Sequence, residues 1–184
     1  MMATKGIFAR DLPCTILSID PGAASGWAHN GAGAWTVGTA SSWRERYAVV
    51  ADAWQLEGQG RPLVVVAEQW TKSGGRPFPV ATIAGLGAQW GRWLAELERL
   101  DVPARRVVRL TTGDWRRVVL GGVRCRSTEA WKAASRARAH AVLGHDPGPD
   151  AADALCIGLA GLRSPAVAAA IGVRELRRLG WEER

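Results

Sequence analysis

Short apolar runs alternate with longer amphipathic stretches along most of the chain. The run at 15–20 (TILSID) is apolar up to its final carboxylate and precedes Pro-Gly, which is typical of a buried strand that ends in a turn. Residues 26–29 and 34–38 follow at the spacing of a β-hairpin. The run at 62–67 (PLVVVA) is β-branched and apolar on both faces, which predicts a central strand, and 106–110 predicts a fifth strand.

Between and after these runs, apolar positions recur at helical spacing. A serine at 41 or 42 can cap a helix that ends near residue 56, and the stretch 80–100 keeps one apolar stripe. Further helices are predicted at 112–120, 127–143, 150–162 and 165–179. This order of elements predicts an α/β fold with a mixed five-stranded sheet and helices on both faces. We expect a leader at 1–14 and one domain at 15–184, to which the last helix, from about 165, is appended.

Four carboxylates stand at the ends of predicted elements. Asp20 ends the first strand, Glu68 ends the central strand, and Asp150 and Asp153 lie three apart at the start of a helix. Taken singly, Asp20 also fits a turn residue and Asp150 also fits a helix cap. Asp153 precedes the apolar segment ALCIGLAGL, so its carboxylate lies on or beside a buried stripe, where an unpaired charge is costly.

If the two strands are neighbours, these four side chains meet at one edge of the sheet. Four carboxylates in one cleft repel each other unless cations occupy it. Oxygen ligands favour Mg²⁺ or Mn²⁺, and two such ions can bracket a phosphodiester, activating water on one side and stabilising the leaving oxygen on the other. The pattern therefore predicts a metal-dependent hydrolase with two ions in its active site.

The overall charge agrees with a polyanionic partner. The 184 residues contain 24 Lys and Arg against 17 Asp and Glu, a formal charge of +7. Almost all the cations are arginine, which GC-rich coding would also produce. Ten tryptophans indicate core packing with some base stacking. Three scattered cysteines, no membrane-length apolar run and no signal-like N-terminus predict a cytoplasmic protein.

Four islands of sequence resemble the RuvC family of Holliday-junction resolvases, in the right order and spacing. ILSIDPGAASGWA is similar to that family's first-strand motif, and VVVAEQW to the motif whose Glu ends the central strand. LGAQWGRW resembles the small-residue motif of its long helix, and DAADALCIGLA its final Asp-x-x-Asp helix. The likeness spans about residues 15–163.

This resemblance implies an RNase H-like fold and a homodimer that acts on branched DNA, namely four-way junctions, in recombination and repair. It implies Mg²⁺-dependent cuts, with Mn²⁺ as a substitute, that leave 5′-phosphate and 3′-hydroxyl ends in a bacterial cell or a phage-infected host. It implies that Asp20, Glu68, Asp150 and Asp153 are catalytic metal ligands. Lys132 stands where the family often has a basic residue near the scissile phosphate, although a solvated helix face explains it equally well.

The chain also departs from the family. Some relatives have a histidine at the position of Asp150. The segment 111–126 does not resemble the corresponding part of the bacterial enzymes, so the chain is more similar to a divergent, phage-type branch of the family. Trp70 and Phe78 are alternative base-stacking residues, and either could belong to the core instead. Candidates for contacts with the DNA backbone are Arg76, Arg105, Arg116, Arg117, Arg124 and Arg126.

Other functions remain alternatives. A nuclease of the same fold could cut flaps or forks, and a non-catalytic junction-binding protein could keep the fold without the chemistry. Retention of all four mutually repelling carboxylates argues against the second. An actin-like ATPase would need a second lobe and a second phosphate loop, for which the chain is too short.

Overall fold

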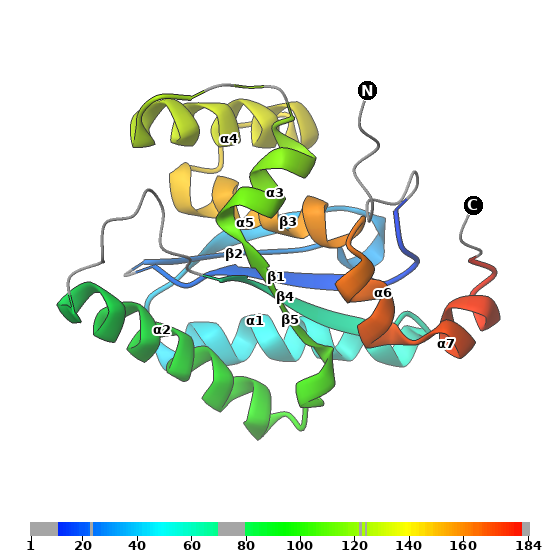
Figure 1. The fold of residues 1–184 in the computed structure, drawn as a ribbon. Helices are drawn as coiled ribbons and strands as arrows, with labels where there is room; N and C mark the ends of the chain where they lie inside the picture. Colours follow the sequence, from blue (N-terminus) through cyan, green and yellow to red (C-terminus); the bar gives the residue numbers. More distant parts are fainter. Residues whose placement is uncertain (1–10, 23, 70–79, 122, 124, 182–184) are drawn as a thin grey trace.

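A mixed five-stranded sheet forms the centre of the molecule. The computed structural model describes residues 11–22, 24–69, 80–121, 123 and 125–181 (Figure 1). The strands are β1 (Thr15–Asp20), β2 (Ser25–His29), β3 (Thr36–Ala40), β4 (Leu63–Gln69) and β5 (Val107–Thr111). Their order in the sheet is β3-β2-β1-β4-β5. β1, β4 and β5 run parallel, whereas β2 is antiparallel to both β1 and β3. The predicted mixed sheet is confirmed.

Helices cover both faces of this sheet, as the sequence predicted. The α-helices are α1 (Trp43–Gln55), α2 (Val80–Arg99), α3 (Thr112–Val119), α4 (Thr128–Leu143), α5 (Pro149–Gly161), α6 (Pro165–Ile171) and α7 (Val173–Arg178). Short 3-10 helices occupy Gly31–Gly33, Leu56–Gln59 and Ala104–Arg106. Figure 1 shows α1 and α2 on one side of the sheet and α3, α4 and α5 on the other, with α4 outermost.

Alternate side chains of the central strands supply two cores. Leu17 and Val65 face one side and pack with residues of α1 and α2, including Trp93. Ile16 and Val64 face the opposite side and pack with residues of α3, α5 and α6. This two-sided burial explains why residues 16–17 of β1 and 63–67 of β4 are apolar on both faces rather than alternating in polarity.

Helix α5 packs directly on the face of the sheet that α3 also covers, and it is almost entirely buried. Its residues from Ala154 to Gly158 are all inaccessible, and the small side chains along it allow close contact with β1 and β2. Among the described residues no single helix is long and apolar enough to cross a membrane, although α5 and α6, bent by 70° at their junction, have the length and composition as a pair.

Several predicted boundaries were wrong, and the central strand β4 continues past Glu68 to Gln69. The third strand begins at Thr36 rather than at residue 34, because the ring of Trp35 packs on the residues of α5 instead of continuing the ladder. The predicted cap at Asp150 is replaced by Gly148, since Pro149 fits the first helical position and starts α5 one residue earlier. The single helix predicted after 165 is divided into α6 and α7 at Gly172, whose φ of 91° breaks the helix.

A buried histidine joins the end of β2 to α1. His29 Nε2 lies 3.0 Å from Asp52 Oδ2, and its ring stacks on Trp27 with the centroids 5.7 Å apart. Burial lowers the pKa of His29 below its usual 6.5, with the Asp52 carboxylate opposing the shift. As the pH falls, the unfolded chain therefore takes up this proton before the folded protein does.

We expect the burial of His29 to make the fold less stable in mild acid. The stability from neutral His29 is present above its unfolded-state pKa and is lost as the pH falls from about 6.5 through the lower pKa of the folded state. Thermal unfolding of wild type and His29→Gln across this range measures the effect, and the variant should lose less stability. Equal pH dependence in the two proteins would show that His29 makes no contribution.

Candidate active site

The parallel pairing of β1 and β4 places Asp20 and Glu68 side by side. Ile19 pairs with Ala67 in this ladder, so Asp20 and Glu68, the next residue of each strand, lie side by side near the carboxyl ends of β1 and β4. Both carboxylates are half-buried. β1 and β4 are therefore neighbours, which the predicted meeting of these carboxylates required.

The first turn of α5 lies directly beside this edge. Gly26 of β2 pairs with Asp20, and a Cβ atom placed on Gly26 would lie only 2.0 Å from the carbonyl oxygen of Asp150. Only a glycine allows the helix to approach β2 so closely. Asp150 and Asp153 occupy this turn of the helix and are both half-buried.

The electrostatics of Asp20 show that the four carboxylates share one region. Burial raises the pKa of Asp20 well above its usual value, and the charges of Glu68, Asp153 and Asp150, in that order, raise it further. Burial also raises the pKa of Asp153; a hydrogen-bonding interaction with Ser135 and the charges of Arg116 and Lys132 oppose the shift, while Glu68 adds to it. Such mutual repulsion destabilises a folded protein unless cations offset it.

Two of the four carboxylates have partners from neighbouring helices. Glu68 Oε1 accepts hydrogen bonds from Thr112 Oγ1 at 2.7 Å and from Trp115 Nε1 at 3.0 Å, both on α3. Lys132 Nζ on α4 lies 3.5 Å from Asp150 Oδ1, an ion pair at the long limit of a hydrogen bond. Asp150 is therefore not a helix cap, because its side chain turns toward α4.

Asp153 has a buried oxygen that makes no hydrogen bond of normal geometry to a described group, although the Ser135 hydroxyl lies near enough to lower the pKa of this carboxyl. Its Oδ1 atom is inaccessible to solvent and has no hydrogen-bond partner among the described residues. A buried carboxylate oxygen without a partner is costly, and a hard cation would remove that cost. The all-oxygen donor set and the clustered negative charge fit a divalent ion of the magnesium class.

The carboxylates do not yet form a coordination shell. Within the described part of the chain, no three His, Cys, Asp or Glu side chains are close enough to hold one ion. The contact of Lys132 with Asp150 holds the Asp150 side chain toward α4. Binding of an ion would thus require some of these side chains to turn.

The candidate DNA-binding residues lie in different parts of the molecule. Trp70, Arg76, Phe78 and Arg124 fall outside the described residues. Arg117 and Arg126 are exposed on or next to the helices that contribute to the acidic site, and Arg117 pairs with Asp114. Arg105 lies in the 3-10 turn before β5, at the opposite end of that strand from the partner of Glu68.

Arg116 differs from a freely exposed DNA contact. Its guanidinium lies 5.1 Å from the ring centroid of Trp115 and 4.7 Å from that of Trp131, so two indoles enclose it. Arg116 is also close enough to Asp153 for its charge to lower the pKa of that carboxyl. The structure therefore places Arg116 beside the acidic site rather than on an open surface.

Sequence reasoning missed Thr112 and Trp115. Both lie in the first five residues after β5, and they reach Glu68 only because β5 is next to β4, where Glu68 pairs with Leu110. The spacing Thr-x-x-Trp at a helix start is compatible with two side chains on one face. Nothing in the local sequence, however, indicates that this face meets a carboxylate more than forty residues earlier.

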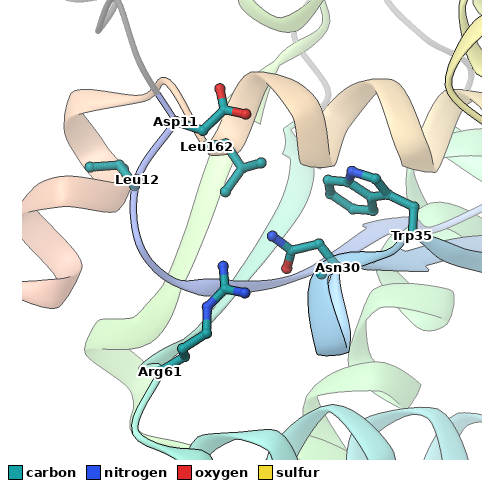
Figure 2. Close-up of a pocket in the computed structure, with 7 residues that line it drawn as sticks. Asp11, Leu12, Asn30, Trp35, Arg61 and Leu162 are labelled. Atoms are coloured by element: carbon teal, nitrogen blue, oxygen red, sulfur yellow. The ribbon is translucent and has the colours of Figure 1, made fainter. Parts of the chain in front are cut away.

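A separate cavity lies at the other end of the sheet (Figure 2). It has a volume of about 190 Å³ and is lined by Asp11, Leu12, Asn30, Gly33, Trp35, Arg61 and Leu162. Two of its polar side chains form hydrogen bonds with the backbone. Asn30 accepts from Ile16 N and donates to Cys14 O, and Arg61 donates to Cys14 O at 2.8 Å. None of the predicted site residues lines it.

Comparisons with known proteins identify the fold. No protein-family profile and no curated protein matches this sequence. The chain resembles the structure of Thermus thermophilus RuvC with a TM-score of 0.48 and 20% identity, over 92% of this chain and 98% of that one. It also resembles T. thermophilus RuvC in complex with a Holliday junction substrate, with a TM-score of 0.50 and 20% identity, over 80% of this chain and 92% of that one. The protein has an RNase H-like fold, as the RuvC in the junction complex does.

Proposed function

We propose that this protein is a divalent-metal-dependent endonuclease that resolves four-way DNA junctions. The observation that carries the proposal is the unsatisfied, buried Oδ1 of Asp153 within a region shared by three further carboxylates. A protein with no use for cations there would gain stability by losing some of these charges. The same fold in a RuvC bound to a Holliday junction substrate supports this substrate class.

We assign the oxygen ligands of two Mg²⁺ or Mn²⁺ ions to Asp20, Glu68, Asp150 and Asp153. When bound, such ions supply a nucleophilic water and stabilise the leaving oxygen of a phosphodiester, which yields 5′-phosphate and 3′-hydroxyl ends. The four carboxylates would hold these ions at the edge of the sheet where β1 and β4 end. Lys132 would lose its partner if Asp150 turned to hold an ion, and we assign the ammonium then freed to a contact with the scissile phosphate.

We assign the exposed Arg117 and Arg126 to contacts with phosphates that flank the cut. They belong to α3 and to the segment before α4, and these two helices carry Trp115 and Lys132 beside the acidic site. Such contacts orient a duplex without reading its sequence. The formal charge of +7 is consistent with a salt-dependent affinity for DNA.

A panel of DNA substrates tests the proposed activity. Wild type and Asp20→Asn would be incubated with a synthetic four-way junction, a fork, a flap and a linear duplex, with and without Mg²⁺. Paired, symmetric nicks in the junction alone are expected from wild type. Equal cutting of forks and flaps would indicate a general branched-DNA nuclease, and binding without cutting would indicate a non-catalytic junction-binding protein.

The choice of metal gives a second prediction. We expect cleavage with Mg²⁺ or Mn²⁺ and none with Ca²⁺, whose larger and more flexible shell suits this chemistry poorly. Product would be measured on denaturing gels over a series of metal concentrations. Activity that persists in excess EDTA after prior dialysis would contradict the metal-dependent proposal.

We further propose that two copies associate through the first half of α2. Ala81 to Gly85 are all exposed, and the side chain of Ile83 is 53% accessible although it belongs to the apolar stripe of this helix. Glycines 85, 87 and 91 have no described neighbour within 4 Å of where a Cβ atom would lie. This end of the helix is uncovered, apart from Thr82 apolar, and free of bulky side chains at its glycines, which suits a twofold dimer in which the same patch of each copy meets.

The dimer proposal predicts the effect of a charge on this face. Ile83→Glu is expected to convert a dimer into a monomer in sedimentation velocity, because like charges would face each other across the twofold axis. Val173→Glu is the matched control, since Val173 on α7 is 64% exposed and lies outside this helix. A monomeric wild type, or a dimer that survives Ile83→Glu, would contradict the proposal.

A further inference from the structure

The carboxylate of Glu68 is fixed from one side by the helix that follows the neighbouring strand. Thr111 ends β5 and caps α3, so the chain turns into the helix beside the end of β4. The first turn of α3 thereby presents Thr112 Oγ1 to Glu68 Oε1 at 2.7 Å, and Trp115 follows with its Nε1 at 3.0 Å. Both distances are those of well-formed hydrogen bonds to a charged acceptor.

The two donors use the same oxygen of Glu68. Oε1 accepts both bonds, and the described residues offer no further hydrogen bond to Oε2. A carboxylate held in this way loses its freedom to rotate, while its second oxygen stays available for a cation. This is the usual arrangement of a ligand whose orientation is set by groups behind it.

The indole of Trp115 is itself held in place on every side. It is 1% exposed and belongs to the core formed with Leu110 and Leu120. Arg116 packs on its ring at 5.1 Å, and Trp131 of α4 covers the other side of that guanidinium at 4.7 Å. A donor with so little freedom can fix the direction of the acceptor that it contacts.

We propose that Thr112 and Trp115 are positioning residues that orient Glu68 for the binding of a divalent cation. This inference rests on the proposed metal site and goes beyond it, because it assigns a role to two neutral side chains that hold no ion. Their effect would be on affinity for the ion, with a consequent effect on the rate at limiting metal concentration.

Two matched pairs of variants test the proposal. Thr112→Val removes the hydroxyl and keeps the shape of the side chain, whereas Thr112→Ser keeps the hydroxyl. Trp115→Phe removes the indole donor and keeps an aromatic ring against Arg116. Trp131→Phe makes the same substitution on the other side of Arg116, where the indole makes no described contact with Glu68.

The first readout is binding of Mn²⁺ alone, without DNA, followed by the electron paramagnetic resonance signal of the free ion. The second is the single-turnover rate of junction cleavage over a series of Mg²⁺ concentrations. Thr112→Val and Trp115→Phe are expected to bind Mn²⁺ about 10- to 100-fold more weakly, as loss of outer-sphere partners does at other metal sites. They should also need correspondingly more Mg²⁺, while Thr112→Ser and Trp131→Phe remain within a few fold of wild type.

Each outcome bears on the inference. Equal Mn²⁺ affinity in Thr112→Val and Thr112→Ser, or in Trp115→Phe and Trp131→Phe, would overturn it. If Trp115→Phe fails to fold, the threonine pair alone decides. A wild type that binds Mn²⁺ but cuts no branched DNA would refute the proposed function and leave this comparison valid, whereas a wild type that binds no Mn²⁺ would overturn both.

Discussion

Asp20→Asn is expected to abolish junction cleavage while leaving junction binding intact. Asparagine keeps the size of the side chain but removes the charge that a divalent ion needs at the end of β1. Loss of about 4 kcal/mol of transition-state stabilisation, a modest share of what bound metals provide, slows a reaction roughly a thousandfold. Single-turnover cleavage in Mg²⁺, with gel-shift binding in Ca²⁺, measures the two effects separately.

The same substitution should stabilise the protein when no metal is present. Asp20 is buried and lies near three other carboxylates, and both effects disfavour its charged form. Removing this charge therefore removes electrostatic repulsion from the folded state. We therefore expect Asp20→Asn to melt at a higher temperature than wild type in EDTA, and Mg²⁺ to raise the melting temperature of wild type more than that of the variant. An inactive variant that is also destabilised would indicate misfolding instead.

A control carboxylate and a second ligand sharpen this test. Asp101→Asn should cleave as wild type does, because Asp101 is exposed beyond α2 and its φ of 54° suits asparagine. Asp153→Asn should fail as Asp20→Asn does. Substantial residual cutting by Asp153→Asn would contradict the assignment of this residue as a metal ligand.

Gly26→Ala is expected to inactivate the protein through a single added methyl group. That group would lie 2.0 Å from Asp150 O, 2.4 Å from Asp150 C and 3.0 Å from Ala151 N, all of them backbone atoms that cannot rotate away. The start of α5 must therefore move off β2 and carry Asp150 and Asp153 away from Asp20. Overpacking of this kind costs about 1–3 kcal/mol, and sometimes more.

Two measurements separate the loss of activity from the loss of stability. For a domain of this size about 1–3 kcal/mol corresponds to a fall of roughly 2–12 °C in melting temperature, so the variant can be assayed while folded. Cleavage well below that temperature should still be lost. Gly22→Ala is the control, since the nearest atom to its added methyl would be 3.8 Å away. If Gly26→Ala melted at the wild-type temperature and cleaved the junction at the wild-type rate, the close approach of α5 to β2 would not be required for activity.

The sequence predicted the sheet edge because the features that form it are local. The apolar runs before Asp20 and Glu68 identify two buried strands, and the parallel pairing of β1 with β4 brings their ends together. The Asp-x-x-Asp spacing at 150 and 153 follows from helical geometry alone. The strand and helix patterns are local and could be interpreted from the residues themselves, whereas the pairing of β1 with β4 is a long-range contact that the sequence prediction had to assume.

The wrong boundaries arose where tertiary contacts or a single backbone angle decide. Trp35 has the apolar character of a strand residue, yet its ring packs with α5 and the strand starts after it. Asp150 has the character of a cap, but Pro149 starts the helix earlier and leaves the Asp150 side chain near Lys132. Gly172 divides the last helix through a positive φ that its neighbours do not signal.

In the folded protein, several of the abundant tryptophan and arginine side chains pack against each other. Arginine guanidiniums pack over the rings of Trp43, Trp90, Trp115 and Trp131 at centroid distances of 4.7–5.5 Å. Trp43, although 52% exposed, lies between Arg44 and Arg99. Cation–π pairs of this kind join residues that are distant in the chain, such as Arg116 and Trp131, and composition alone cannot assign the partners.

Crystals grown with Mn²⁺, with anomalous difference maps recorded near the manganese edge, would test the central claim most directly. We predict two strong peaks at the carboxyl end of β1 and β4, each within coordination distance of the carboxylates that surround it, with Asp153 Oδ1 among the ligands. Mn²⁺ that binds elsewhere on the molecule, while Asp20 and Asp153 remain without an ion between them, would contradict the account.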